Sequence, residues 1–368
     1  MRKLNICLVS LTIAPDSQDG AGKGFRGIFD YLRKKGHSVK LITGKWNSDL
    51  NDPDIIQFNL IRKRFLWAPQ FFFKAVKYIN GHDFDIFHGN APKGTLPLIL
   101  SKKRNYITTI HDLGPFETTF TKIPIERQLI KLAINKAPII TTVSNFIKRE
   151  IKHFIPKTDL NKIYVHYNGI DEKFKPYPRE ALKLKEKLNL DGPVIIYIGR
   201  IAFYKGVNHI IEAYQIAKKK IPNLNLVIGG IPDFQMEKTY QEWKVKYHDI
   251  HFVGFIEEDE LPYYYSLGDV FVTYSFASEG FGLTPIEAIA CGTPVICSSM
   301  IAYKEILQEN AIFVTPESPI LLAQEIINTL EDTTRIRSLM EKAQKFIQRY
   351  SWNSVGEKIE KIYYKSLN

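Results

Sequence analysis

The sequence predicts an α/β protein built from two doubly wound domains, each with a parallel sheet. Three observations predict it. Short apolar runs alternate with helical patterns, which is typical of parallel sheets covered by helices on both faces. The alternation restarts near residue 194 after an irregular stretch. The 368 residues, 45% of them apolar, suffice for two domain cores.

In the first half, apolar runs mark strands, and apolar residues at helical spacing follow most of them. We expect strands at 4–10, 38–43, 85–88, 106–110 and 139–143. We expect helices at 25–35, which Gly36 closes, and near 69–80, 124–136 and 145–154.

Residues 168–179 carry Gly169, Pro176 and Pro178 among charges and show no periodicity, which is typical of a connection between domains. The second series begins with a strand at 194–199 and a helix from residue 207. Further strands are expected at 224–228, 251–253, 270–274 and 294–297. The predicted domains are therefore 1–172 and 173–350, with a C-terminal helix at about 351–368 that packs back on the first domain.

The apolar start of the chain has the basic beginning of a signal peptide. Asn5 and Thr12 interrupt its apolar run, Asp16 follows, and no small-residue cleavage site is present, so we expect a buried first strand. No run of about 18 uncharged apolar residues predicts a transmembrane helix. The three cysteines form no pattern typical of zinc or disulfides, which favours a reducing, cytoplasmic compartment.

The net charge of +11 is unevenly distributed. Residues 1–172 contain 27 basic and 15 acidic side chains, whereas the rest of the chain contains 23 and 24. This asymmetry indicates an anionic partner for the first domain, such as a membrane surface, a phosphorylated acceptor or nucleic acid. Scattered, solvated lysines explain the same count equally well.

The most specific stretch is 278–295, SEGFGLTPIEAIACGTPV. Gly280 and Gly282 let the backbone approach a ligand closely. A helix that opens near Thr284 leaves the amides of Leu283 and Thr284 free, and such a helix start binds anions. This segment is therefore a candidate site for a phosphate.

Two carboxylates flank this candidate anion site. Glu279 and Glu287 can accept hydrogen bonds from the hydroxyl groups of a sugar. An alternative exists for Glu287: with Thr284 as N-cap and Pro285 as the first helical residue, Glu287 completes a capping box that needs no ligand. The same alternative does not apply to Glu279.

A second cationic feature lies on a predicted strand-to-helix turn. Gly199 and Arg200 precede Lys205 and Gly206 by a short loop. A guanidinium and an ammonium that converge on one turn suit a diphosphate. Two solvated loop cations are the alternative, since such residues are mostly exposed.

Gly22, Gly24 and Gly27 match the pattern G-x-G-x-x-G of dinucleotide-binding proteins. About ten residues separate them from the first predicted strand, whereas that fingerprint places its glycines directly after the strand. These glycines are therefore weak evidence for a nicotinamide cofactor.

Asp83 and Asp85 form a D-x-D pattern typical of metal-dependent transferases, but they precede a strand directly, so we expect a turn and no metal.

The order of these motifs resembles the retaining glycosyltransferases of family 4, which include sucrose synthases and many bacterial mannosyltransferases. The likeness extends over nearly the whole chain and rests on six segments: 109–116, 140–151, 167–171, 199–206, 253–272 and 278–296. It implies the GT-B fold, in which two Rossmann-like domains face one another across a cleft. It also implies an acceptor-binding first domain and a donor-binding second domain.

The resemblance implies roles for individual residues. Arg200 and Lys205 would bind the donor diphosphate, Glu279 the donor sugar and Glu287 the ribose. His111 would lie beside the reacting sugar carbon. The remaining donor-binding positions would be Gly22 and Gly24 of a glycine-rich loop before the first helix, Gly199, Phe255 and Ile256 at the base, and Gly280, Phe281, Gly282, Leu283 and Thr284.

The activity implied is transfer of a sugar from a nucleotide-diphosphate donor, UDP- or GDP-linked, to a glycan or a lipid-phosphate-linked acceptor. No metal or other cofactor and no nucleic acid are expected. The basic segment 62–64, before an aromatic helix, suits peripheral contact with an anionic membrane on its cytoplasmic face, although a buried helix with a solvated stripe explains it too. A nicotinamide-dependent oxidoreductase and a non-catalytic nucleotide-sugar binding protein remain as alternatives.

Overall fold

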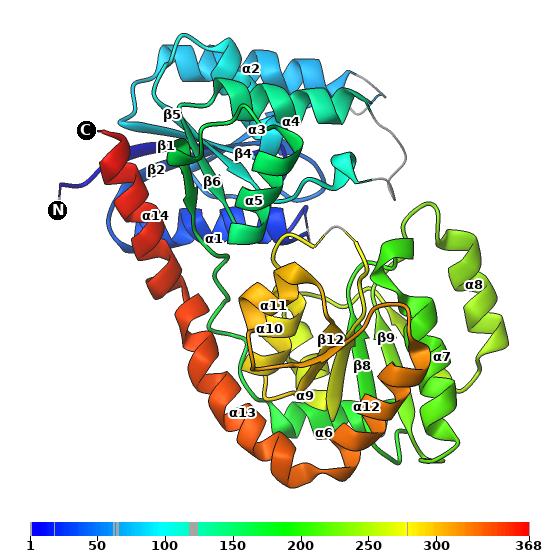
Figure 1. The fold of residues 1–368 in the computed structure, drawn as a ribbon. Helices are drawn as coiled ribbons and strands as arrows, with labels where there is room; N and C mark the ends of the chain where they lie inside the picture. Colours follow the sequence, from blue (N-terminus) through cyan, green and yellow to red (C-terminus); the bar gives the residue numbers. More distant parts are fainter. Residues whose placement is uncertain are drawn as a thin grey trace. The chain divides into compact units, whose positions relative to one another are not determined.

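The computed structural model describes residues 2–17, 19–61, 63, 66–117, 124–277 and 279–367. Contacts divide the chain into two compact units (Figure 1). The first, which we call the N-terminal domain, comprises Met1–Gly169 and Tyr350–Asn368; the second, the C-terminal domain, comprises Ile170–Arg349. The division falls within the irregular segment 168–179, and the end of the chain belongs to the N-terminal domain.

The described residues of the N-terminal domain form one parallel sheet of seven strands in the order β3-β2-β1-β4-β5-β6-β7. The order reverses beside β1, whose Leu8 pairs with Leu41 of β2 and with His88 of β4. The strands are β1 (Asn5–Val9), β2 (Ser38–Lys45), β3 (Ile55–Asn59), β4 (Ile86–Asn90), β5 (Tyr106–Ile110), β6 (Ile139–Thr142) and β7 (Ile163–Val165). A reversal of this kind places ligand sites at the carboxyl ends of the adjoining strands.

Helices cover both faces of this sheet. In Figure 1, α1 and α14 lie side by side on one face, and α2, α3 and α4 lie on the other. The helices are α1 (Gly20–Lys34), α2 (Trp67–Gly81), α3 (Ala91–Leu100), α4 (Pro124–Lys136), α5 (Asn145–Phe154) and α14 (Trp352–Ser366), with short 3₁₀ turns η1 (Gly114–Phe116) and η2 (Leu160–Lys162).

The C-terminal helix α14 is built into the core of the N-terminal domain. Its Ile359 and Tyr363 pack with α1 and the central strands. The Tyr363 hydroxyl lies 2.6 Å from Nδ1 of the buried His88. A Cβ atom on Gly27 of α1 would lie within 1.9 Å of the Trp352 ring, so glycine permits this close approach.

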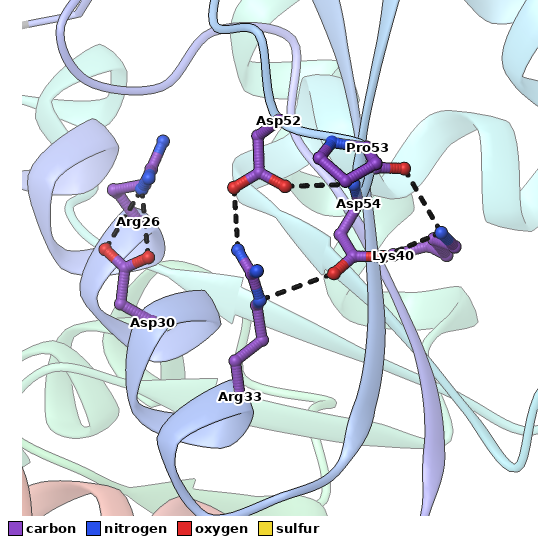
Figure 2. A network of polar contacts seen from close by, with 7 residues as sticks. All are labelled: Arg26, Asp30, Arg33, Lys40, Asp52, Pro53 and Asp54. Carbon is purple, nitrogen blue, oxygen red and sulfur yellow. Dashed lines mark hydrogen bonds and ion pairs between the residues drawn. The ribbon is translucent and has the colours of Figure 1, made fainter.

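An ion-pair network on the surface joins α1 to the connection between β2 and β3 (Figure 2). Arg33 contacts Asp52 at 2.6 Å and Asp54 at 3.4 Å. Lys40 approaches the other oxygen of Asp54 at 2.7 Å, and Asp52 accepts from the Asp54 amide at 2.9 Å. Because these groups are partly solvated, the network orders a loop more than it stabilises the fold.

The described residues of the C-terminal domain form a second parallel sheet, of six strands, in the order β10-β9-β8-β11-β12-β13. The strands are β8 (Val194–Ile198), β9 (Asn225–Gly229), β10 (Ile250–Gly254), β11 (Val270–Thr273), β12 (Val295–Ser298) and β13 (Ile312–Val314). The central strands β8 and β11 are buried throughout, as strands covered on both faces must be.

The helices of this domain pack against both faces of its sheet. On one face, Ile210 and Tyr214 of α7 meet Leu322 and Ile326 of α12 in a continuous apolar core. The helices are α6 (Pro178–Lys187), α7 (Val207–Lys218), α8 (Glu237–Lys246), α9 (Leu261–Leu267), α10 (Leu283–Ala290), α11 (Ile301–Leu307), α12 (Pro319–Glu331) and α13 (Thr333–Ile347), with 3₁₀ turns η3 (Phe203–Lys205) and η4 (Gln348–Tyr350).

The predicted strands are confirmed, each with ends within two residues of those expected. The start of the first helix is wrong: α1 begins at Gly20 rather than at residue 25, because the Asp19 carboxylate caps it by accepting from the Gly22 amide at 2.7 Å. No helix in the described part of the chain is long and apolar enough to cross a membrane.

Candidate functional site

The C-terminal domain holds a buried carboxylate beside a lysine. Glu279, 7% exposed, follows β11, and Lys205 ends the 3₁₀ turn η3. The Lys205 ammonium donates to Oε1 of Glu279, and the Ser275 hydroxyl donates to the same oxygen at 2.8 Å. A buried carboxylate is tolerated when it is paired in this way. The structure therefore brings two predicted site residues, 74 positions apart, into direct contact.

Arg200 belongs to the same group of side chains. The Arg200 guanidinium lies 5.8 Å from the centre of the Tyr204 ring, and the Lys205 ammonium lies 5.2 Å from it. The Tyr197 hydroxyl donates to the Arg200 carbonyl at 2.8 Å. Burial raises the pKa of Tyr197, the Glu279 charge raises it further, and Arg200 opposes them. The charges of Arg200, Lys205 and Glu279 therefore act within one small region.

The helix α10 begins next to this region. Its N-cap is Gly282, with a φ of +84°, and a Cβ atom there would lie 2.5 Å from the Tyr303 ring. Gly282 has no side chain that could cap this end. The amides of Leu283 and Thr284 in its first turn therefore receive no cap from that residue, and the helix dipole favours an anion at this position.

The capping box considered for Glu287 is wrong. Thr284 is the second residue of α10 rather than its cap, and Pro285 is the third rather than the first. Glu287 therefore lies two residues too far along the helix for a capping box. Its side chain is 4% exposed and accepts a hydrogen bond from the Tyr265 hydroxyl at 2.7 Å. Burial, followed by the Glu287 charge, raises the pKa of Tyr265.

The other donor-side positions lie where β8, β9 and β10 end. The Gly199 amide donates to the Gly229 carbonyl at 3.0 Å, and a Cβ atom on Gly230 would lie 1.9 Å from the Gly199 carbonyl oxygen. Ile256 is buried against Gly229, whereas Phe255 is 48% exposed. Close backbone packing thus holds residues 255–256 beside the ends of these strands.

In the N-terminal domain, His111 follows β5 and ends a chain of hydrogen bonds. The Ser10 hydroxyl donates to the Thr12 carbonyl at 2.6 Å and accepts from Nδ2 of Asn90 at 3.0 Å. The amide oxygen of Asn90 therefore faces Nε2 of His111, at 2.6 Å. This assigns the proton of neutral His111 to Nε2 and leaves Nδ1 as a hydrogen-bond acceptor.

The surroundings keep this histidine neutral. Burial, and after it the charge of His166, lower the pKa of His111 to about 4 against the opposing effect of Asp19. Because the imidazole is uncharged near pH 7, it can accept a hydrogen bond from a hydroxyl group but cannot supply a positive charge.

Gly22 and Gly24 lie inside the first turns of α1, not in a loop that precedes it, so that expectation is wrong. The Gly22 amide is bound by Asp19. A Cβ atom on Gly24 would lie 2.8 Å from the amide oxygen of the buried Asn168. Both glycines therefore have packing roles within the N-terminal domain.

Two family models match the chain. Glycosyltransferase Family 4 matches residues 18–174, and Glycosyl transferases group 1 matches residues 178–349. The chain belongs to the family 4 glycosyltransferases. This identification, together with α1 beginning eleven residues after β1 ends, removes the nicotinamide alternative.

Relatives of this glycosyltransferase agree with the family. An uncharacterized glycosyltransferase of Methanocaldococcus jannaschii is 30% identical over 238 residues, 61% of this chain and 59% of that protein. O-antigen chain mannosyltransferase B of Escherichia coli is 25% identical over 73% of this chain and 71% of that protein. The match to the archaeal protein thus spans less than two thirds of its length.

The fold of this glycosyltransferase is also that of solved structures. HepE of Anabaena, in complex with UDP and glucose, is 19% identical and superposes with a TM-score of 0.78 over 98% of this chain and 99% of that one. At this identity the likeness shows the fold alone. The fold is therefore the GT-B fold, with two parallel-sheet α/β domains.

Several side chains that contact the candidate residues were not predicted from the sequence of this glycosyltransferase. They are Asn90, Ser275, Tyr197, Tyr265 and Tyr303, the last of which lies against Gly282. Only Asn90 carried a signal, because it is the polar residue at the end of β4. The other residues are tyrosines and a serine, and in such positions these residue types are as common in a core or a turn as in a functional site.

The D-x-D pattern has structural partners. Asp85 pairs with Arg2 at 2.6 Å and accepts from the Asn5 amide at 2.8 Å, and Asp83 pairs with Lys103 at 2.6 Å. These contacts fit the expected turn.

Of the basic segment 62–64, the two arginines lie outside the described residues. The helix α2 that follows buries Phe71 and exposes 72% of Phe73.

Proposed function

We propose that this chain is a retaining hexosyltransferase that moves a sugar from a UDP- or GDP-linked donor to a glycan or lipid-phosphate-linked acceptor. The observation that supports it most is the buried Glu279, held by Lys205 and Ser275 beside the start of α10 at Gly282. A carboxylate, two cations and a helix start within one domain suit the sugar and the diphosphate of such a donor.

The relatives support the donor class. The solved HepE structure contains UDP and glucose, and the relative from Escherichia coli is a mannosyltransferase. In the proposal, Arg200 and Lys205 bind the diphosphate, Glu279 binds the sugar and Glu287 the ribose. Residues 281–284 contribute backbone amides, and residues 255–256 line the base.

In the proposed reaction the bond between the sugar C1 and the diphosphate oxygen breaks, and a bond from the acceptor oxygen to C1 forms on the same face. The acceptor proton passes to the leaving diphosphate. Arg200 and Lys205 stabilise the charge that develops on the leaving group, so we propose that no metal ion is required. Holding both substrates in place supplies much of the remaining acceleration.

The N-terminal domain is proposed to bind the acceptor, and His111 to contact the transferred sugar. The excess of basic residues in this domain supports peripheral contact with an anionic membrane on its cytoplasmic face. The helix α5, for example, carries Lys148, Arg149 and Lys152 around a shallow surface cavity. Such contact would bring the chain to a lipid-linked acceptor.

Thermal denaturation with UDP, GDP, ADP and their hexose derivatives tests the donor. A ligand that binds the folded state raises the melting temperature according to its affinity. We expect one nucleotide series to stabilise the protein and the sugar nucleotide to be cleaved when an acceptor is present. NMR of the product should show retained anomeric configuration. Absence of stabilisation by every nucleotide would contradict the proposal.

A further inference from the structure

The N-terminal domain contains a cavity of about 600 Å³, which is large enough for one sugar ring. It lies where β1, β2, β4 and β5 end, and the starts of α1, α2 and α3 border it. His111 and Asn90 line one part of it, and Trp46 and Trp67 line another. The cavity therefore joins the candidate histidine to a pair of aromatic rings.

The two tryptophans come from different elements but form one aromatic corner. Trp46 follows β2 and Trp67 begins α2, and their ring centres lie 5.8 Å apart with planes at 70°. The Trp46 indole N–H donates to the Leu11 carbonyl at 3.0 Å, which fixes that ring. An indole face is electron-rich and apolar, so it suits the C–H-bearing face of a pyranose ring.

The charged groups that line the cavity are mainly acidic. Asp16, Asp19, Asp112 and Glu126 contribute carboxylates, whereas Lys93 is the one lysine or arginine among the cavity's described lining and approaches Glu126 at 3.5 Å. This is opposite in sign to the domain as a whole. Carboxylates accept hydrogen bonds from sugar hydroxyls and repel phosphate.

The position of Asp16 shows how the polar side of the cavity is built. Its Oδ1 accepts from the amides of Asn47 and Ser48, at 3.2 and 2.9 Å. These two residues directly follow Trp46, so the carboxylate is tied to the aromatic corner. The lining thus combines an aromatic surface with a carboxylate fixed beside it.

We propose that this cavity binds an uncharged sugar residue of the acceptor, with its ring against Trp46 or Trp67 and its hydroxyls on carboxylates such as Asp16. The proposal rests on the proposed function and specifies its acceptor. Any phosphate that the acceptor carries lies outside the cavity. The acidic lining selects the sugar end of such a molecule.

Saturation-transfer NMR with methyl α-D-mannoside, methyl α-D-glucoside and mannose 6-phosphate tests the proposal directly. We expect a methyl glycoside to bind and the sugar phosphate to bind more weakly. Trp67→Leu should weaken glycoside binding about tenfold, and Trp67→Phe should retain most of it. The control Phe73→Leu, on the same helix but 72% exposed, should bind like the wild type.

Three outcomes would overturn the proposal: no binding of either glycoside, equal binding by Trp67→Leu and the wild type, or tighter binding of the sugar phosphate. Thermal stabilisation by nucleotides, measured on the same variants, separates this proposal from the proposed function. If nucleotides stabilise the protein but glycosides do not bind, the acceptor site is wrong. If glycosides bind and no nucleotide does, the transferase proposal fails instead.

Discussion

The two domains share a sheet architecture but carry opposite kinds of candidate site. In the C-terminal domain, Lys205 and Glu279 form an ion pair beside a helix start that favours anions. In the N-terminal domain, His111 is held neutral at the end of a chain of uncharged hydrogen bonds. The first arrangement suits a charged diphosphate, and the second suits hydroxyl groups. Which chemistry a Rossmann-like domain performs thus depends on the side chains at its strand ends.

The net charge of each domain does not report the charge of its site. The first 172 residues carry all of the positive excess, yet the charged groups that line their cavity are mainly carboxylates. The remainder is almost neutral in total, yet it contains Arg200 and Lys205 at the candidate donor site. The excess charge therefore belongs to the outer surface of the N-terminal domain, where it can act on a large anionic partner.

The largest expected effect tests the ion pair of the C-terminal domain. Lys205→Ala removes a charge that stabilises the leaving diphosphate and leaves Glu279 without its partner, so we expect turnover to fall about 10²–10³-fold. The control is Lys220→Ala, since Lys220 pairs with Glu331 at 2.9 Å with both side chains about half exposed. It should change turnover less than about twofold. Turnover near the wild-type rate in Lys205→Ala would remove this residue from the mechanism.

The next effect concerns the glycine that opens α10. Gly282→Ala combines a left-handed φ of +84° with a contact of 2.5 Å to Tyr303, and we expect a loss of about 3 kcal/mol in the free energy of unfolding. Gly254→Ala is a matched control, because Gly254 has a φ of +70° and nothing within 4 Å of the added Cβ. It should cost about 1 kcal/mol. Urea denaturation measures both, and equal losses would show that the Tyr303 contact is unimportant.

The neutral histidines of the N-terminal domain predict a dependence of stability on pH. Burial lowers the pKa of His166 to about 4 and also lowers the pKa values of His88 and His111. Below pH 6.5 the unfolded chain binds protons that the folded chain does not, so stability is complete above that pH and falls toward pH 4. Carboxyl groups with lowered pKa values lose their stabilising contribution only below about pH 5.

His166→Gln should reduce this dependence, because it removes one such group. Between pH 6.5 and 5, the free energy of unfolding should fall by about 2 kcal/mol less than in the wild type. Urea denaturation at both pH values measures the difference. The exposed His248→Gln serves as a control and should show the wild-type slope. An unchanged slope in His166→Gln would contradict the argument.

The smallest effect is expected at the surface network of Figure 2. Asp52→Ala removes one contact to Arg33 and one to the Asp54 amide. Because Arg33 is partly solvated and still has Asp54 nearby, we expect a loss of less than about 1 kcal/mol and no change in turnover. Thermal denaturation checks this, and a loss of several kcal/mol would show that the network stabilises the fold.

Much of the fold could be predicted because alternation of apolar runs and helical faces is a local signal. Prediction from this signal failed where the local conformational preference of a segment differs from the conformation that tertiary packing imposes. The helix α3 contains Gly94 and Pro97, which argue against a helix, yet both are buried and the helix forms. The edge strands β3 and β7 were not predicted: β3 is only partly buried and contains polar residues, and β7 has only three residues.

The candidate site shows the same limit. Glu279 and Lys205 could be predicted because each lies in a motif of its own, although nothing local shows that they touch. The N-cap of α10 was misplaced because Thr284 is a common capping residue, whereas the backbone at Gly282 ends the preceding loop. The pair Trp46 and Trp67 carried no signal, since the two rings meet only through the fold.

The most direct test of the account is a crossed binding measurement on Lys205→Ala and Trp67→Leu. Calorimetric titration with the nucleotide that stabilises the wild type should show lost affinity in Lys205→Ala and wild-type affinity in Trp67→Leu. Titration with the methyl glycoside should show the reverse. Nucleotide binding that is unchanged in Lys205→Ala, or weakened equally by both substitutions, would contradict the division of donor and acceptor between the two domains.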